Sequence, residues 1–125
     1  MNLPSTFDPG VVAALDALDA GAIRHVFFVA CGGSLSIMHP AKFLLDQHSP
    51  LPSDVYNGAE FVARAPRSLD ERSLVILCSM TGTTKETTAA AEFARSRGAK
   101  TIGLTVEPAS PLGRAVDHVV GFEAP

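Results

Sequence analysis

Two stretches of this sequence concentrate glycine and small hydroxyl or thiol residues at the ends of apolar runs. The first is CGGSLS at positions 31–36, and the second is CSMTGTTKET at positions 78–87. Glycines let backbone N–H groups approach a ligand closely and tolerate a positive φ. Serine and threonine hydroxyls each donate one hydrogen bond without adding charge. Such a set of neutral donors suits an anion, and a phosphate group in particular.

Each stretch leads into a helical pattern, and the N-terminus of a helix adds N–H donors and a partial positive charge. Hydrogen bonds to a charged acceptor contribute about 1.5–3 kcal/mol each. Four or five of them could hold a phosphate monoester at roughly micromolar to millimolar affinity after the costs of association. Serine and threonine are also ordinary turn and cap residues, so either stretch alone would be weak support. The candidate phosphate-binding residues are Gly32, Gly33, Ser34, Ser79, Met80, Thr81, Gly82, Thr83 and Thr84.

A carboxylate near the second stretch needs an explanation, because Glu86 would repel a phosphate. Glu86 follows Thr83 by three residues, which matches the capping box. In that arrangement the carboxylate folds back to the backbone of Thr83 and turns away from the ligand. The pattern therefore predicts a helix that starts at Thr83 and ends at Gly98.

Sugar-isomerising chemistry would also need a general base within reach of a carbon-bound proton. Glu60 follows the second predicted strand and is the best carboxylate candidate for a sugar contact, with a capping or surface role as the alternative. His39 lies one turn after the first stretch and could approach a ligand or a partner subunit. Lys85 could screen phosphate charge. His25 and His118 open strands at the opposite sheet edge and are expected to be structural. No residue pair is convincing enough to be named catalytic.

Several function classes do not fit the sequence. Neither stretch has the glycine spacing of the dinucleotide fingerprint or the P-loop, and no His, Cys or acidic spacing suggests a metal site. We therefore expect no metal and no cofactor. The formal charge of −3, without a basic run, argues against nucleic acid. The chain lacks a signal segment and any run of about 18 apolar residues, so we expect a cytoplasmic protein with no membrane partner.

The elements that carry these residues are predicted from periodicity and caps. Short apolar runs at 25–30, 73–79, 100–105 and 118–122 are typical of buried strands, and 53–57 is a weaker edge strand. Apolar positions Ile37, Met38, Ala41, Leu44 and Leu45 predict a helix from Ser34, and a brief helix follows through Glu60 to Arg64. Asp8 and Pro9 predict the start of an N-terminal helix that ends at Gly21. Cys31 and Cys78 each close a strand and are expected to be small buried residues, with a disulfide or reactive thiol as the alternative.

Strands that are apolar throughout and alternate with helices predict a parallel sheet covered on both faces. We expect an α/β fold, a three-layer, doubly wound, flavodoxin-like domain with five strands in the order 2-1-3-4-5. The 125 residues would form one domain, with residues 1–8 as a flexible lead-in. Strands one and three would then be neighbours, and both polar stretches would meet at the switch point between them.

On these residues the chain resembles the sugar isomerase (SIS) domain family. CGGS and SMTGTTKET resemble its two phosphate-loop signatures, the second usually written S-x-S-G-x-T-x-E-T. Further agreement in GGSLSIMHPAKFLLDQHS, AEFVARAP and the segment from TIGLT to DHVV points to fructosamine-6-phosphate deglycases. The resemblance spans roughly residues 20 to 122. The sequence departs from it at Thr81, where serine is usual, and at Ala59, where asparagine often precedes Glu-Phe.

The resemblance implies a phosphosugar ligand, with Ser34, Ser79, Thr81 and Thr84 as phosphate-binding hydroxyls. The related deglycases convert a 6-phosphofructosyl amine to glucose 6-phosphate and the free amine, and they carry two such domains with the catalytic residues in the second. This chain corresponds to the first domain alone, so it would be a fragment, half of an enzyme, or a single-domain protein completed by oligomerising. A homodimer or higher oligomer is expected from the family. The alternatives are a phosphosugar-sensing regulatory module and a scaffold half that needs a separate catalytic partner. The amine and the sugar epimer stay open.

Overall fold

The structure is a computed structural model that describes residues 20–122. Five parallel strands form one sheet in the order β2-β1-β3-β4-β5, which confirms the predicted α/β fold and strand order. The strands are β1 (His25–Ala30), β2 (Ser53–Asn57), β3 (Ser73–Cys78), β4 (Lys100–Thr105) and β5 (His118–Gly121). The strand order reverses between β1 and β3, where the predicted site lies.

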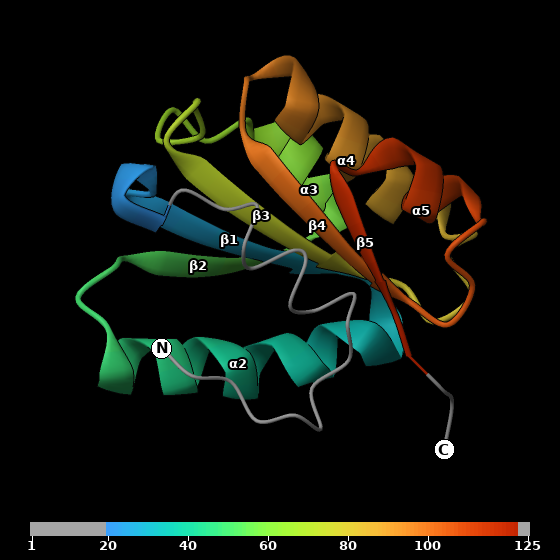
Figure 1. The fold of residues 1–125 in the computed structure, drawn as a ribbon, viewed down its shortest axis with the longest axis horizontal. Helices are drawn as coiled ribbons and strands as arrows, with labels where there is room; N and C mark the ends of the chain where they lie inside the picture. The colour runs from blue at the N-terminus through green and yellow to red at the C-terminus, as the bar shows by residue number, and fades with distance from the viewer. Residues whose placement is uncertain (1–19, 123–125) are drawn as a thin grey trace.

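Helices cover both faces of the sheet (Figure 1). On one face lies α2 (Leu35–His48), and on the other lie α3 (Gly58–Arg64), α4 (Lys85–Ser96) and α5 (Pro111–Ala115). Two short 3-10 segments, η1 (Ala20–Ala22) and η2 (Gly32–Ser34), flank β1. None of the helices in this part of the chain is long and apolar enough to cross a bilayer.

The sheet divides the core into two apolar layers, because successive side chains of a strand point to opposite faces. Phe27, Val29 and Leu77 point toward α3, α4 and α5, and Phe28, Ala30 and Cys78 point toward α2. The central strands are therefore apolar at almost every position. This two-sided burial explains why continuous apolar runs predicted the strands well.

The α3 side is organised around aromatic and alanine packing. Phe61 of α3 is fully buried, with its ring centroid 5.6 Å from Phe27 and 5.9 Å from Phe93. Three alanines of α4 are also fully buried. Their small side chains let the helix lie close to the sheet, which positions the N-terminus of α4 at the switch point.

Some of the helix predictions need correction, and others lie outside the described residues. The first helix begins at Leu35 rather than Ser34, because η2 takes up the preceding turn, and Ile37 and Leu44 are more than half exposed rather than buried. The face of α2 that packs on the sheet carries Met38, which is buried, and Leu35, Ala41 and Leu45, which are partly buried. The helix α5 was missed. The predicted helix from Asp8 and the lead-in at 1–8 lie outside the described residues.

Replacing Phe61 by alanine should lower the free energy of unfolding by about 3–5 kcal/mol, because it leaves a cavity among the aromatic rings. The neighbouring Val62 is partly exposed on the same helix, so Val62→Ala should cost less than about 1 kcal/mol. Denaturant unfolding of both variants measures the difference. Equal losses would mean that α3 does not pack against β1 as described.

Candidate functional site

The two polar turns leave neighbouring strands at the same edge of the sheet. Ala30, the last residue of β1, is paired with Cys78, the last residue of β3. The first turn (residues 31–34) therefore starts beside the second turn (residues 79–84). The structure brings together the two stretches that the sequence singled out.

Side-chain contacts link the first turn to the elements around it. Thr87 in the first turn of α4 donates to Cys31 Sγ over 3.6 Å, and the Ser34 hydroxyl lies beside the Cys78 thiol at the end of β3. Burial raises the pKa of the Cys78 thiol, and the bond from Ser34 opposes that shift in part. Neither cysteine forms a disulfide; Cys78 is buried as predicted, whereas Cys31 is only half-buried, which corrects the prediction for that residue. The Cys31 thiol therefore links the first turn to the start of α4.

The second turn is held by its own hydroxyls. Ser79 Oγ accepts a hydrogen bond from the Gly82 N–H at 3.1 Å and lies 3.1 Å from Thr84 Oγ1. Thr81 Oγ1 and Thr83 Oγ1 are 2.7 Å apart. These bonds curl the backbone into a loop without a single charged side chain.

The segment from Thr105 to Leu112 also holds this loop in place. The Met80 carbonyl accepts hydrogen bonds from the Val106 N–H and from the Thr105 hydroxyl, at 2.9 and 3.2 Å. The Gly82 carbonyl accepts one from the Leu112 N–H at 3.0 Å. Gly82 has φ +73°, and a Cβ there would lie 3.0 Å from Thr105 Oγ1 and closer still to Ser110 Oγ. The connection from β4 to α5 therefore fixes the shape of the second turn.

The sequence pattern did not predict a helix in this supporting segment. Ser110 accepts a hydrogen bond from the Gly113 N–H, and Pro111 is the first residue of α5. A serine cap followed by proline is the usual signature of a helix start. The segment is short and contains two prolines, so its sequence pattern favoured an irregular connection over a helix.

The predicted capping box is wrong. The helix α4 begins at Lys85, its N-cap is Thr84, and the Thr84 side chain makes no capping hydrogen bond. No bond joins Thr83 to Glu86 among residues 20–122, because the Thr83 hydroxyl is bonded to Thr81 instead. Glu86 is exposed at the start of the helix. The first-turn N–H groups of α4 are therefore left without a side-chain cap and point toward the switch point.

Exposure divides the candidate hydroxyls into two groups. Ser79 is only 2% exposed, which favours a role in shaping the turn. Thr81 and Thr83 are exposed, and Ser34 and Thr84 are half-buried. Gly32, Gly33 and Met80 are also exposed, and Gly82 is buried. A ligand between the turns could reach the second group of hydroxyls and the exposed backbone.

The side chains considered for proton transfer or for screening phosphate charge are all exposed. Glu60 is exposed and lies 3.3 Å from the Asn57 amide and 3.6 Å from Arg64 Nε, and Asn57 caps α3 by accepting the Glu60 N–H. His39 is exposed on α2, and Lys85 is exposed at the start of α4. Within the described residues, no group of three His, Cys, Asp or Glu side chains could hold a metal ion.

The histidines at the opposite edge of the sheet are placed as predicted. His25 opens β1 and lies 2.7 Å from an Asp54 carboxylate oxygen, with its ring stacked on Phe27. His118 is the first residue of β5. Both are at the amino ends of their strands, away from the two turns.

Comparison with known proteins places this geometry in a family. A model of the SIS domain matches residues 22–125. The fructosamine deglycase FrlB of Bacillus subtilis is 49% identical over 114 residues, and the fructoselysine 6-phosphate deglycase of Escherichia coli is 34% identical over 116. A crystal structure of a provisionally assigned phosphosugar isomerase from Bacillus subtilis superposes with a TM-score of 0.87 at 45% identity.

These matches cover most of this chain but only part of each relative. The alignments include 90% and 93% of the chain but 35% and 34% of the two deglycases. The crystal structure is matched over 93% of this chain and 35% of its own. The chain therefore spans about a third of the length of its relatives.

Replacing Gly82 by alanine should lower the free energy of unfolding by about 2 kcal/mol or more, because the left-handed backbone alone costs about 1–2 kcal/mol for an L residue. The added Cβ would also collide with Ser110. Gly33→Ala is the matched control, since a Cβ at Gly33 has no neighbour within 4 Å. Denaturant melts of both variants check this, and an unaffected Gly82→Ala protein would refute the described loop.

Proposed function

The chain belongs to the SIS domain family, and from this premise we propose that it binds the phosphate group of a phosphosugar between the two turns. The observation that carries the proposal is the joining of the turns across the edge of β1 and β3. Ala30 is paired with Cys78, and Thr87 of α4 donates a hydrogen bond to Cys31 Sγ. Hydroxyls and backbone donors from both turns therefore lie at the same edge of the sheet.

The donor set favours a phosphate over a smaller or less charged group. Thr81, Thr83, Thr84 and Ser34 supply hydroxyls, and the start of α4 supplies backbone N–H groups. A dianion can accept many hydrogen bonds at once, and charge-assisted bonds are about twice as strong as neutral ones. The exposed Glu86 carboxylate disfavours general anion binding, so affinity should depend on close contact with the hydroxyls rather than on net charge.

For the sugar, we propose a 6-phosphofructosyl amine, the substrate class of a fructosamine-6-phosphate deglycase. The support is the similarity to the fructosamine and fructoselysine 6-phosphate deglycases. The overall reaction adds one water and releases glucose 6-phosphate and the free amine, after a proton has moved between C1 and C2. The proton transfer needs a general base.

The described residues are better suited to binding a phosphate group than to catalysing the proton transfer. Glu60 accepts a hydrogen bond from the Asn57 amide and lies 3.6 Å from Arg64 Nε. Its carboxylate therefore already has two polar partners. We therefore propose that this domain binds the phosphosugar and that turnover requires residues from a further domain or a partner subunit. A homodimer of this chain is one way to supply them.

Removing one hydroxyl from each turn should weaken binding of a 6-phosphorylated sugar by about tenfold or more, which is the loss of about 1.4 kcal/mol. The variant is Ser34→Ala with Thr84→Val, and its melting temperature should stay within about 5 °C of the parent because neither side chain caps a helix. Calorimetric titration with fructose 6-phosphate measures the affinity.

Two controls make that result specific. Thr88→Val removes a hydroxyl of α4 that has no hydrogen-bond partner, and it should leave the affinity unchanged. Unphosphorylated fructose should bind to none of the proteins. If the double variant binds as tightly as the parent, the phosphate does not sit between the two turns.

The catalytic part of the proposal has its own experiment. Release of glucose 6-phosphate from a 6-phosphofructosyl amine should be undetectable with this chain alone, while the same preparation binds the substrate. Activity should appear when a deglycase second domain is supplied in trans. Binding without restored activity would favour a regulatory module, and turnover by the chain alone would show that its own residues complete the site.

A further inference from the structure

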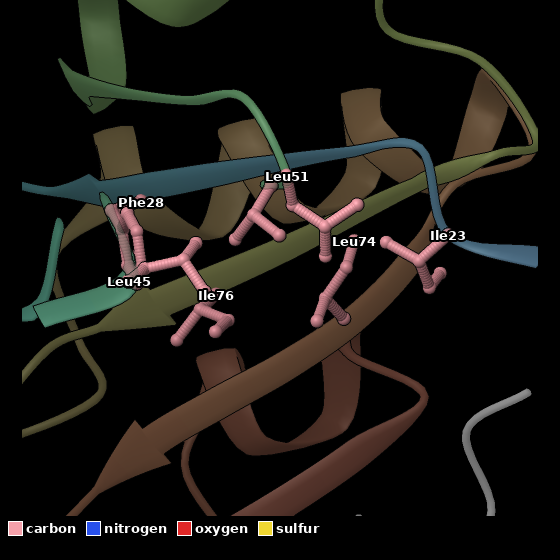
Figure 2. Close-up of a pocket in the computed structure, with 7 residues that line it drawn as sticks. Ile23, Phe28, Leu45, Leu51, Leu74 and Ile76 are labelled. Atoms are coloured by element: carbon pink, nitrogen blue, oxygen red, sulfur yellow. The ribbon is translucent and has the colours of Figure 1, made fainter. Parts of the chain in front are cut away.

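The two faces of the sheet differ in how closely the helices pack. On the face that carries α2, an apolar groove of about 180 Å³ is lined only by aliphatic and aromatic side chains. Figure 2 shows these side chains, among them Phe28 of β1, Leu45 of α2 and Ile76 of β3. On the other face, α3 and α4 contact each other directly. The start of α4, which borders the second turn, therefore lies on the closely packed face.

The first turn of α3 lies at the same edge of the sheet as the two polar turns. Asn57, the last residue of β2, is paired with Ala30, and Ala30 is paired with Cys78. The helix α3 begins at the next residue, Gly58. The Asn57 side chain accepts the Glu60 N–H at 2.8 Å and donates to Glu60 Oε1 at 3.3 Å. These two bonds fix the start of α3 at the height where β1 and β3 end.

Gly58 contacts the backbone of the first turn of α4. Gly58 is buried, and a Cβ added there would lie 2.7 Å from the Glu86 carbonyl oxygen and 3.2 Å from the Thr87 nitrogen. Real Cβ atoms essentially never show separations under 3.0 Å. The φ of Gly58 is not positive, so the need for glycine here is steric rather than conformational. Any side chain at this position would push the two helices apart.

The atoms that face Gly58 cannot make room by changing a rotamer, because they belong to the backbone of α4. The helix α4 begins at Lys85, so Glu86 and Thr87 lie in the turn whose N–H groups lack a side-chain cap. About two turns later, the ring of Phe93 packs on Phe61 of α3, with the ring centroids 5.9 Å apart. Contacts with α3 at two levels therefore fix the position of the start of α4.

Resting on the proposed function, we propose that Gly58 is a positioning residue for binding of the phosphate group. The hydroxyls of the second turn are held by the connection from β4 to α5, whereas the N–H groups of α4 are placed by α3. A phosphate that accepts bonds from both sets needs the two at the right separation, because N–H···O bonds span about 2.7–3.2 Å. With a methyl group at position 58, the Glu86 carbonyl oxygen would have to retreat from 2.7 Å to about 3.4 Å, an ordinary van der Waals separation. A displacement of that size takes bonds from α4 to the phosphate out of range.

The test compares alanine substitutions of two glycines that lie at opposite ends of α4. Gly58→Ala adds a methyl group against the start of the helix, and Gly98→Ala places an L residue at φ +83° just after its end. A Cβ at Gly98 would lie 3.4 Å from Glu71, which is ordinary contact. Both variants should melt at a lower temperature than the parent. In calorimetric titration, Gly58→Ala should bind fructose 6-phosphate about tenfold or more weakly, and Gly98→Ala should stay within about twofold of the parent.

A rescue variant separates positioning from a loss of stability. Asn57→Ala removes both side-chain bonds that hold the first turn of α3, so α3 rather than α4 can yield to the added methyl group. The double variant Asn57→Ala with Gly58→Ala should therefore regain affinity while melting at a still lower temperature, because it also loses a helix cap. Equal losses of affinity in Gly58→Ala and Gly98→Ala, or a double variant that binds no better than Gly58→Ala, would overturn the proposal.

The position of α4 can also be measured without a ligand. The methyl group should push the start of α4 away from β1, so nuclear Overhauser contacts between the side chains of Thr87 and Cys31 should weaken in Gly58→Ala and persist in Gly98→Ala. If the parent does not bind fructose 6-phosphate, the proposed function fails, and these contacts alone decide whether Gly58 positions α4. Should Gly58→Ala be unfolded at room temperature, both measurements are made in the cold with sucrose, which stabilises folded states. Contacts unchanged in Gly58→Ala would refute the positioning role.

Discussion

The parallel pairing of β1 with β3 is the constraint on which the site depends. The two strands are adjacent in the sheet and distant in the sequence, and their last residues, Ala30 and Cys78, are paired. The backbone therefore leaves β1 and β3 at the same height along the sheet. Without that shared level, the glycine and hydroxyl residues that follow would be ordinary turn residues on separate parts of the surface.

The arrangement separates residues that shape the second turn from residues that can touch a ligand. Ser79 is buried and holds Gly82, while Thr105 and the backbone of Val106 hold Met80. The exposed hydroxyls of Thr81 and Thr83 project from a loop that is already formed. Preorganisation of this kind reduces the ordering cost of binding a ligand at this turn.

The sheet could be predicted because its signals are local. Each central strand is an apolar run between polar turns, and right-handed crossovers restrict the order. The turn after β3 was also predicted at the right place, since glycine and threonine cluster there. The capping box failed for a different reason. Thr83 and Glu86 have the right spacing, but Thr83 bonds to Thr81 and Thr84 bonds to Ser79, and spacing alone cannot rank competing partners.

Other features could not be predicted because they depend on distant parts of the chain. The support given by Thr105 and Leu112 to the second turn joins residues about 25 or more positions apart. The exposed position of Ile37 and Leu44 follows from the rotation of α2 about its axis, which packing against β1 and β2 decides. An amphipathic pattern gives the existence of a helix more reliably than the edges of its buried stripe.

The two turns differ in how firmly they are anchored. The second turn is held by hydrogen bonds at two backbone carbonyls, from β4, Val106 and α5, whereas the first turn is held to α4 by one hydrogen bond to the Cys31 sulfur. The shape of the second turn is thus coupled to β4 and α5. A change in the connection between those two elements should therefore be felt at residues 79–84, although it lies far from them in the sequence.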